Sequence, residues 1–381
     1  MKKILFRKLL LDYLTFLFIA LLSASVVIWV FQAVNYLDIM IEDGRDYLVY
    51  LNFSLLNFPK IISKIFPFVL FFSLYYVTIK YELNNELMIL WNFGIHKIQI
   101  INFFFLISIF LTILQVLFTS FVVPNSQDLA RSFLRTSEVN FYGNFVKPQK
   151  FNDTIKGVTI YTDKKDKNGF LNNLYIKKEL NKNHFQITYA SKGKFKEINS
   201  IPILVLYDGA TITLKNKELT NISFSKSDFS LANFESNTTT YIKTQELSST
   251  KIIKCINNYY KFNNEDNFRL ASKNIENCNV RNINNIFKEF YKRFIIPFYI
   301  PILSLVPFLL ILISKENSKY QKLRVVTFLI GMVVIIFSET TIRFISQSMT
   351  QNISLISIPL ILLIFIYLFL FKKFKSNFKS A

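Results

Sequence analysis

The sequence predicts an α+β membrane protein with six transmembrane helices and one β domain inserted between the third and the fourth helix. Two observations lead to this prediction. First, 51% of the 381 residues are hydrophobic, 42 are phenylalanine, and the apolar residues fall in long blocks, as they do in membrane-spanning chains. Second, one long polar segment, residues 124–290, separates the first three blocks from the last three.

Four uncharged runs are each longer than the roughly 20 residues that a bilayer-crossing helix requires. They cover residues 13–37, 98–127, 294–314 and 344–371. Two shorter runs, 65–79 and 325–338, are bounded by charged residues. Both extend to full spans, because a lysine at a helix end can reach the membrane surface and a Glu and an Arg one turn apart can pair.

The distribution of lysine and arginine predicts that both termini are cytoplasmic, because positive residues concentrate in short cytoplasmic loops. Basic clusters occur at the N-terminus, in the loop 315–324 and at the C-terminus. The opposite loop, near 38–57, has only Arg45 among several acidic residues. We expect no cleavable signal peptide, because the first apolar run is too long and no small-residue cleavage pattern follows it.

This orientation places residues 124–290 outside the cytoplasm. Short runs rich in β-branched and aromatic residues, separated by Gly, Asn, Asp and Lys, are typical of strands. They cover residues 157–163, 173–179, 184–191, 201–209, 210–215 and 221–231. Their spacing is typical of a sandwich, jelly roll or open barrel. Residues 246–290 are rich in asparagine, have a more helical pattern and lead back to the membrane.

The sequence therefore divides into three parts. Residues 1–123 hold the first three transmembrane helices and a cytoplasmic helix near 81–94. Residues 124–290 form the periplasmic domain and its return linker, and residues 291–381 hold the last three transmembrane helices.

Several function classes are disfavoured. The net charge of +20 follows from basic residues at membrane edges, so it does not indicate nucleic-acid binding. The two histidines, His96 and His184, fall on opposite sides of the membrane, so we expect no metal site, and we expect no cofactor. The eight glycines form no phosphate-binding loop, so we expect no ATPase site and no catalytic residues in this chain.

Cys255 and Cys278 lie in the predicted periplasmic part, where oxidation is possible. A disulfide between them and two free thiols both remain open.

The segment "KYELNNELMILWNFGIHK", residues 80–97, has the pattern of a short amphipathic helix. Its apolar stripe consists of Leu83, Leu87, Leu90 and Trp91. Glu82 and Glu86 share an adjacent polar face, and Gly94 is suited to end the helix. We expect a docking helix whose stripe enters a groove of a partner, where Glu86 meets a basic residue. The alternative is that the second span simply continues past the bilayer and frays.

Residues 57–95, "NFPKIISKIFPFVLFFSLYYVTIKYELNNELMILWNFGI", resemble the second span and coupling helix of the LptF/LptG permeases. The matching features are Pro59 and Pro67 in the span, then Glu86-Leu87, Leu90 and Gly94-Ile95. The segments "FVVPNSQDLAR" and "YKRFIIPFYIPILSLVPFLL" resemble the exit from the third span and the start of the fourth. The chain departs from the family at Asn92 and Phe93, where small residues are usual.

The resemblance implies a permease of an ABC-type lipopolysaccharide export complex in the bacterial inner membrane. It also implies that the domain between the third and the fourth transmembrane helix is periplasmic and β-jellyroll-like. In such a complex LptF pairs with LptG, a cytoplasmic ATPase, LptB, supplies energy, and lipopolysaccharide passes to a periplasmic β-jellyroll bridge of LptC and LptA. Contact with the ATPase would involve Glu86, Leu87, Leu90, Trp91 and Gly94. The segment 157–179 resembles the LptF type more than the LptG type.

Basic residues recur at the predicted outer rim of the membrane. They are Lys60, Lys64, Arg131, Arg135, Arg293 and Arg343. Such residues would form charge-assisted contacts with the phosphates of lipid A, although each can also serve only to anchor a helix. Lys60, Arg131 and Arg343 match basic positions in one or other paralogue. Glu339 lies four residues before Arg343, so we expect it to hold Arg343 when no substrate is bound.

Two other functions remain open. The chain could be a permease for another lipid or a lipoprotein, or a membrane-anchored receptor or structural protein that transports nothing. The coupling helix discriminates between transport and the second alternative, because a receptor does not need it.

Overall fold

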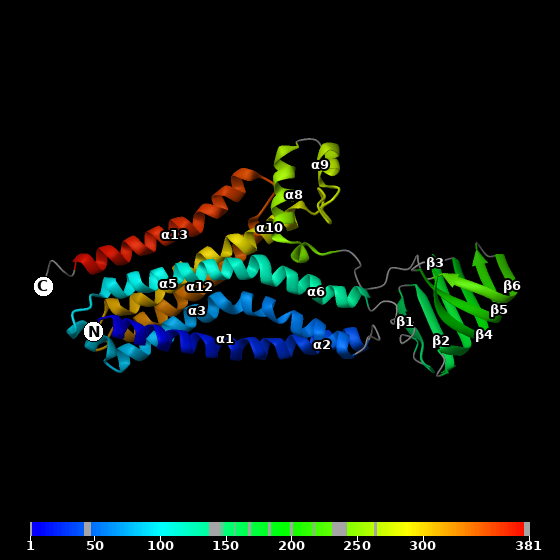
Figure 1. Ribbon diagram of the computed structural model, residues 1–381, viewed down its shortest axis with the longest axis horizontal. Coiled ribbons are helices and arrows are strands. Elements are labelled where there is room, and N and C mark those ends of the chain that lie inside the picture. The colour runs from blue at the N-terminus through cyan, green and yellow to red at the C-terminus, as the bar shows by residue number, and fades with distance from the viewer. Residues whose placement is uncertain are drawn as a thin grey trace. The chain divides into compact units, whose positions relative to one another are not determined.

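Figure 1 shows the computed structural model of the chain. It forms two compact units, one of Met1–Val30, Asn57–Asp128 and Ile242–Ala381, the other of Phe31–Leu56 and Leu129–Tyr241. The structure describes residues 2–41, 47–136, 146, 148–155, 157–166, 169–181, 184–198, 201–215, 218–230, 242–262 and 265–376.

The prediction of six membrane-spanning helices is confirmed. The candidate spans are Lys2–Leu37, Tyr47–Leu83, Lys97–Leu134, Ile283–Leu312, Tyr320–Phe344 and Met349–Phe374. Their helices are α1 (Lys2–Ile41), α2 (Tyr47–Leu56), α3 (Phe58–Leu83), α5 (Lys97–Leu117), α6 (Val123–Thr136), α10 (Ile283–Phe294), α11 (Tyr299–Leu305), α12 (Tyr320–Thr341) and α13 (Met349–Ser376). A short helix, α4 (Glu86–Asn92), lies between the second and the third span.

The fourth span is the most deeply buried, with 78% of its most apolar window inside the protein against 11% for the first span. It is also broken: α10 and α11 are joined by a 3₁₀ turn, and a second 3₁₀ segment follows α11. Pro297, Pro301 and Pro307 explain the breaks, because proline lacks the backbone N–H that an α-helix requires. α11 packs against α3, α5, α12 and α13, which shield it from lipid.

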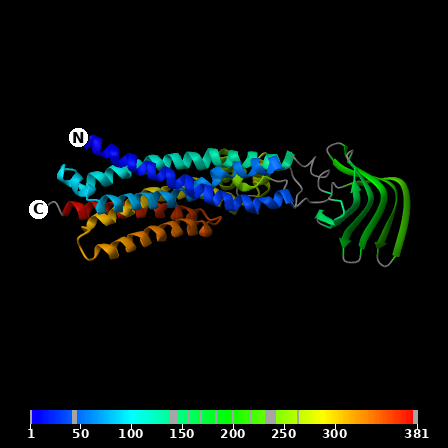
Figure 2. The ribbon, with the colours of Figure 1, turned by 90° about the horizontal axis from the view of Figure 1, so that it is seen from below.

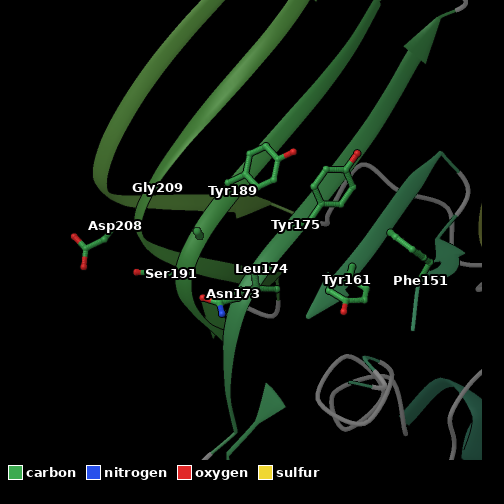
Figure 3. Close-up of a pocket in the computed structure, with 10 residues that line it drawn as sticks. Phe151, Tyr161, Asn173, Leu174, Tyr175, Tyr189, Ser191, Asp208 and Gly209 are labelled. Atoms are coloured by element: carbon green, nitrogen blue, oxygen red, sulfur yellow. The ribbon is translucent and has the colours of Figure 1, made fainter. Parts of the chain in front are cut away.

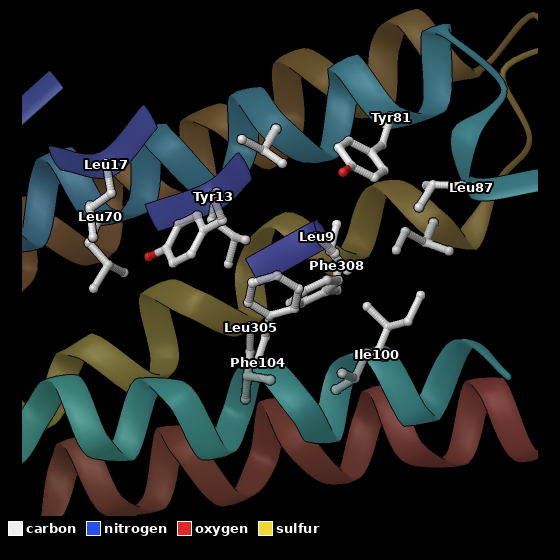
Figure 4. Close-up of a cluster of buried hydrophobic side chains, with 14 of the residues drawn as sticks. Leu9, Tyr13, Leu17, Leu70, Tyr81, Leu87, Ile100, Phe104, Leu305 and Phe308 are labelled. Atoms are coloured by element: carbon white, nitrogen blue, oxygen red, sulfur yellow. The ribbon is translucent and has the colours of Figure 1, made fainter. Parts of the chain in front are cut away.

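Large side chains and one glycine fill the centre of the bundle. The ring of Phe104 lies 5.5 Å from that of Tyr13 and 5.4 Å from that of Phe308 (Figure 4). On another side, Gly331 of α12 faces the buried ring of Phe71 in α3, and a Cβ atom there would lie 2.0 Å from the ring. The glycine therefore allows these two helices to approach closely.

The inserted β domain is one antiparallel sheet of six described strands (Figure 2). They are β1 (Asn152–Ile155), β2 (Val158–Lys165), β3 (Phe170–Asn181), β4 (His184–Ile198), β5 (Ile201–Lys215) and β6 (Glu218–Ser230). Within the described residues the strands follow sequence order, which is a meander, whereas a jelly roll consists of two Greek keys.

The expected strand break at Gly209 is wrong, because β5 is continuous from Ile201 to Lys215. Asp208 has φ +50, so the backbone changes direction there without ending the strand. Gly209 fits because a Cβ atom would lie 2.1 Å from the carbonyl oxygen of Tyr189 on the neighbouring strand. The strand β1 was not expected from the sequence, because its four residues include two polar ones and an aspartate.

Residues 242–262 and 265–290 form helical structure beside the fourth span. α8 (Ser249–Lys261) begins at Ser248, whose hydroxyl accepts a hydrogen bond from the N–H of Lys251, and α9 (Glu265–Ser272) follows. Cys255 of α8 and Cys278 form a disulfide. Both cysteines lie in one apolar cluster with Ile252, Phe268 and Ile286, so the disulfide closes a small core of its own.

Candidate functional site

The backbone of α4 is set by two residues with positive φ. Asn85, at φ +61, turns the chain after α3, and Gly94, at φ +69, ends the helix. The N–H of Ile95 donates to the carbonyl of Leu90 at 3.1 Å, and that of Gly94 donates to Trp91 at 2.9 Å. This pair of bonds is the usual glycine stop of a helix, and Ile95 and Leu90 are both buried, as that motif requires.

The expectation that the stripe of α4 faces a partner is wrong for Leu87 and Leu90. Leu87 and Leu90 are 3% and 5% exposed and belong to the core of the bundle with Leu9 and Ile100 (Figure 4). A short amphipathic helix covers the nearest apolar surface, and here that surface is the chain's own first, second and third spans. Trp91 is half-buried, and the ammonium of Lys97 lies 5.8 Å from its ring.

Four other apolar side chains around α4 are exposed instead. They are Leu83, Met88, Ile89 and Phe93, and we call them the α4 face. Sequence periodicity placed Leu83 in the predicted stripe but missed Met88, Ile89 and Phe93, which flank the buried residues of that stripe. Exposed apolar side chains that lie together mark contact surfaces.

Three polar contacts join the start of α1 to the α4 region. Lys2 Nζ donates to the carbonyl of Gly94 at 2.9 Å, and Lys8 Nζ lies 3.8 Å from the carboxylate of Glu86. The hydroxyl of Tyr81, at the end of α3, donates to Asp12 at 2.5 Å. A carboxylate among apolar residues of a span usually has a polar partner, so Asp12 could have indicated this contact from the sequence alone.

On its other side the α4 region contacts the end of the fourth span. Glu82 accepts a hydrogen bond from the N–H of Lys315 at 3.2 Å, and Lys315 Nζ donates to the carbonyl of Leu83 at 3.1 Å. Lys97 Nζ donates to the carbonyl of Ile311 at 2.9 Å. The α4 region is therefore fixed to both α1 and the broken fourth span.

The basic residues predicted at the opposite membrane rim have different surroundings. Lys60 is half-buried and donates to the side-chain oxygen of Gln245 at 3.1 Å, whereas Lys64 is exposed. Arg131 is half-buried in α6 and has interactions with its neighbours. The side chain of Arg135 lies outside the described part of the structure.

Arg293 is not a rim cation, contrary to the sequence expectation. Its side chain is 2% exposed, and its guanidinium donates to Glu289 at 3.0 Å and to the carbonyls of Leu247 and Gln245 at 2.8 and 3.0 Å. The carbonyl of Arg293 accepts a hydrogen bond from Thr119 at 3.0 Å. The donors of this guanidinium are largely used inside the protein, so Arg293 fixes the segment before α8 to the start of the fourth span.

Glu339 and Arg343 are both exposed, and within the described chain no salt bridge joins them. The expected spacing of one helical turn is not kept, because α12 ends at Thr341 and a 3₁₀ turn, Ile342–Phe344, follows. The Arg343 guanidinium therefore needs no release from Glu339 before it can meet a ligand.

Six apolar helices, a broken fourth span and a helix folded back against the bundle define a multi-pass membrane protein with an inserted β domain. Within the described residues no group of three or more His, Cys, Asp and Glu could hold a metal ion. Residues 7–373 match the family model described as Lipopolysaccharide export system permease LptF/LptG, and the chain belongs to this family. The resemblance seen in the sequence is confirmed, and the choice between the LptF and the LptG type stays a prediction.

The chain is also similar to Uncharacterized protein RP871 of Rickettsia prowazekii (strain Madrid E). The two are 23% identical over 214 residues, which are 56% of this chain and 59% of that protein. The match thus spans less than two thirds of the relative's length.

Replacing Arg293 with Ala should destabilise the bundle. Removing one partner of a buried ion pair costs about 3–5 kcal/mol, because Glu289 and the two carbonyls lose their donor. We expect a lower unfolding temperature in detergent, measured by the fluorescence of the two native tryptophans. Arg281→Ala, at an exposed position, is the control. Equal unfolding temperatures for both variants would contradict this role of Arg293.

Proposed function

We propose that this chain is a permease subunit of an ABC-type complex that extracts lipopolysaccharide from the bacterial inner membrane. The observation that carries the proposal is the family match over residues 7–373. We further propose that the LptB ATPase drives the chain, that the chain acts as the LptF-type partner of LptG, and that LptC and LptA receive the substrate. The sequence contains no phosphate-binding loop, which agrees with a separate ATPase.

We assign the α4 region to ATPase contact. The α4 face presents apolar side chains to a partner, and Glu86 lies at its edge with its carboxylate partly exposed. A partner that displaces α4 would also displace α1, because Lys2, Lys8 and Asp12 hold the region to that helix. Movement of the ATPase would therefore be transmitted through the α4 region to the first, second and fourth spans.

The opposite rim is assigned to the phosphates of the substrate. The basic residues predicted there from the sequence are Lys60, Lys64, Arg131, Arg135 and Arg343. Arg343 is exposed, and within the described residues no salt bridge joins it to Glu339. Charge-assisted hydrogen bonds from arginine to phosphate are among the stronger polar contacts. This assignment requires the β domain to be periplasmic and both termini to be cytoplasmic.

Labelling of single cysteines tests the orientation. Ser225 in the β domain and Ser318 in the loop before α12 are both exposed. With the native disulfide retained, a membrane-impermeant maleimide should label Ser225→Cys in cells with a permeabilised outer membrane. It should label Ser318→Cys only after the inner membrane is opened. The reverse pattern would overturn the orientation and the phosphate assignment with it.

Charge reversal at Glu86 tests the ATPase contact. If Glu86 meets a basic residue of the ATPase, Glu86→Lys should lower lipid-stimulated ATP hydrolysis of the complex about tenfold or more, since losing a desolvated charged contact costs about 2–5 kcal/mol. The internal pair with Lys8 contributes only about 0–1 kcal/mol, because it is partly solvated.

The double variant Lys8→Glu with Glu86→Lys is the matched control, because it restores the internal pair. Hydrolysis that stays low in the double variant supports contact with the ATPase. Full recovery would show that Glu86 acts only through Lys8, and unchanged hydrolysis in Glu86→Lys would remove the ATPase contact altogether.

Arg343→Ala tests the phosphate assignment. We expect weaker photo-crosslinking of lipopolysaccharide to the transmembrane bundle, because the variant lacks a charge-assisted contact. Assembly of the complex should be unchanged, since Arg343 is exposed. Arg281→Ala, which removes an exposed arginine outside the rim set, should leave crosslinking unchanged. Crosslinking as strong as that of the unaltered chain, or loss of assembly, would exclude Arg343 as a phosphate contact.

A further inference from the structure

A row of aromatic side chains crosses the β domain (Figure 3). Tyr161 of β2 pairs directly with Tyr175 of β3, and Tyr175 pairs with Tyr189 of β4. The rings of Tyr175 and Tyr189 are 5.2 Å apart, and the ring of Phe151, just before β1, lies 5.0 Å from that of Tyr161. The four aromatic residues thus form two ring pairs, and the paired positions of Tyr161 and Tyr175 place these pairs on neighbouring strands in one aromatic row.

This aromatic row lies on the face of the sheet opposite the core of the domain. Ile160 and Ile176, which adjoin Tyr161 and Tyr175 in sequence, are buried in the core, and successive side chains of a strand point to opposite faces. Tyr189 is 50% exposed and Phe151 is 67% exposed. The rings are thus not required to fill the core of the domain.

A row of short polar side chains runs beside the aromatic row. It consists of Asp163, Asn173, Ser191 and Asp208, one from each of four neighbouring strands. The residues of the polar row face one another on neighbouring strands, but they are absent from the paired positions of the sheet. Two of them, Asn173 and Asp208, also have positive φ values, +52 and +50. The ladder is therefore interrupted along one line, which leaves these side chains available beside the rings.

Part of the polar row is held in place internally. Asn173 Nδ2 donates to Asp163 at 2.8 Å, and Ser191 Oγ donates to the carbonyl of Tyr207 at 3.1 Å. The hydroxyl of Tyr161 also bonds to Asp163, and this bond raises the pKa of that hydroxyl. Asp208 is exposed, so its carboxylate can accept hydrogen bonds from a ligand.

The aromatic row and three members of the polar row, Asn173, Ser191 and Asp208, line a groove of about 600 Å³. None of its described lining residues is a lysine or an arginine, and Asp208 contributes a carboxylate. A phosphate would find no cation here and would be repelled by the carboxylate. An acyl chain would cover the exposed carboxylate of Asp208 without offering it a hydrogen bond, which costs free energy. A neutral ligand with one apolar face and many hydroxyl groups fits both rows.

We propose that this groove binds a saccharide, with the C–H face of a sugar ring against the aromatic row and its hydroxyls bonded to the polar row. Aromatic faces carry partial negative charge and attract such C–H groups. Resting on the proposed function, the ligand is the neutral sugar part of lipopolysaccharide. The β domain would thus recognise sugars, while the basic rim of the bundle recognises phosphates.

The test uses the full-length complex and a neutral oligosaccharide released from lipopolysaccharide by removal of lipid A. Titration followed by saturation-transfer NMR should detect binding. Tyr175→Ala and Tyr189→Ala should each weaken binding about tenfold, because each removes a stacking surface. Tyr189→Phe, which keeps the ring, should bind within about threefold of the unaltered chain. Equal binding by the alanine variants, or no binding by the unaltered complex, would overturn the proposal.

Hydrogen exchange on the unaltered complex gives a second measurement that does not depend on the folding of a variant. The oligosaccharide should slow exchange around Asn173, Ser191 and Asp208, and unchanged exchange there would count against the groove.

A third measurement uses lipid A without further sugars as the ligand. It should stimulate ATP hydrolysis equally in the unaltered complex and in Tyr189→Ala.

Loss of lipid A stimulation in Tyr189→Ala, with oligosaccharide binding intact, would mean that the groove holds the lipid part and would overturn the proposal. Failure of lipid A to stimulate even the unaltered complex would argue against the proposed function, whatever the oligosaccharide does.

Discussion

Burial of the fourth span is the constraint on which the rest of the bundle depends. Three prolines interrupt its helix, and each break leaves backbone groups that lipid cannot satisfy. Such a segment is stable in a membrane only when other helices surround it, and α3, α5, α12 and α13 do so. The close approach of α12 at Gly331 and the buried guanidinium of Arg293 both serve this enclosure.

The same enclosure determines which side chains of the α4 region stay exposed. Leu87 and Leu90 cover the end of the bundle, whereas Leu83, Met88, Ile89 and Phe93 remain exposed. The end of the fourth span is held to Glu82, Leu83 and Lys97. A displacement of the α4 region would therefore act directly on the end of the buried fourth span.

Much of the fold could be predicted from the sequence. Long uncharged runs indicate membrane-spanning helices, and short runs rich in β-branched residues indicate strands. The six spans and the inserted antiparallel β domain followed from this. The orientation of α4 did not, since periodicity identifies an apolar stripe but does not tell whether the chain or a partner covers it. The prediction for Arg293 was wrong for a related reason. The sequence near a span end does not tell whether an arginine faces lipid headgroups or internal acceptors such as Glu289 and the carbonyls of Leu247 and Gln245. The aromatic row of the β domain was also missed, because it depends on register among three strands.

The bond between Asp12 and Tyr81 has a consequence for biogenesis. Asp12 is synthesised early and reaches the translocon well before its partner, which follows 69 residues later. Asp12 directly precedes the uncharged run 13–37, so the nascent first helix can keep this carboxylate at the hydrated membrane surface. Emergence of the end of the second span then supplies the phenol hydroxyl that bonds to it. This polar contact between the two helices therefore forms only after the second has been translated.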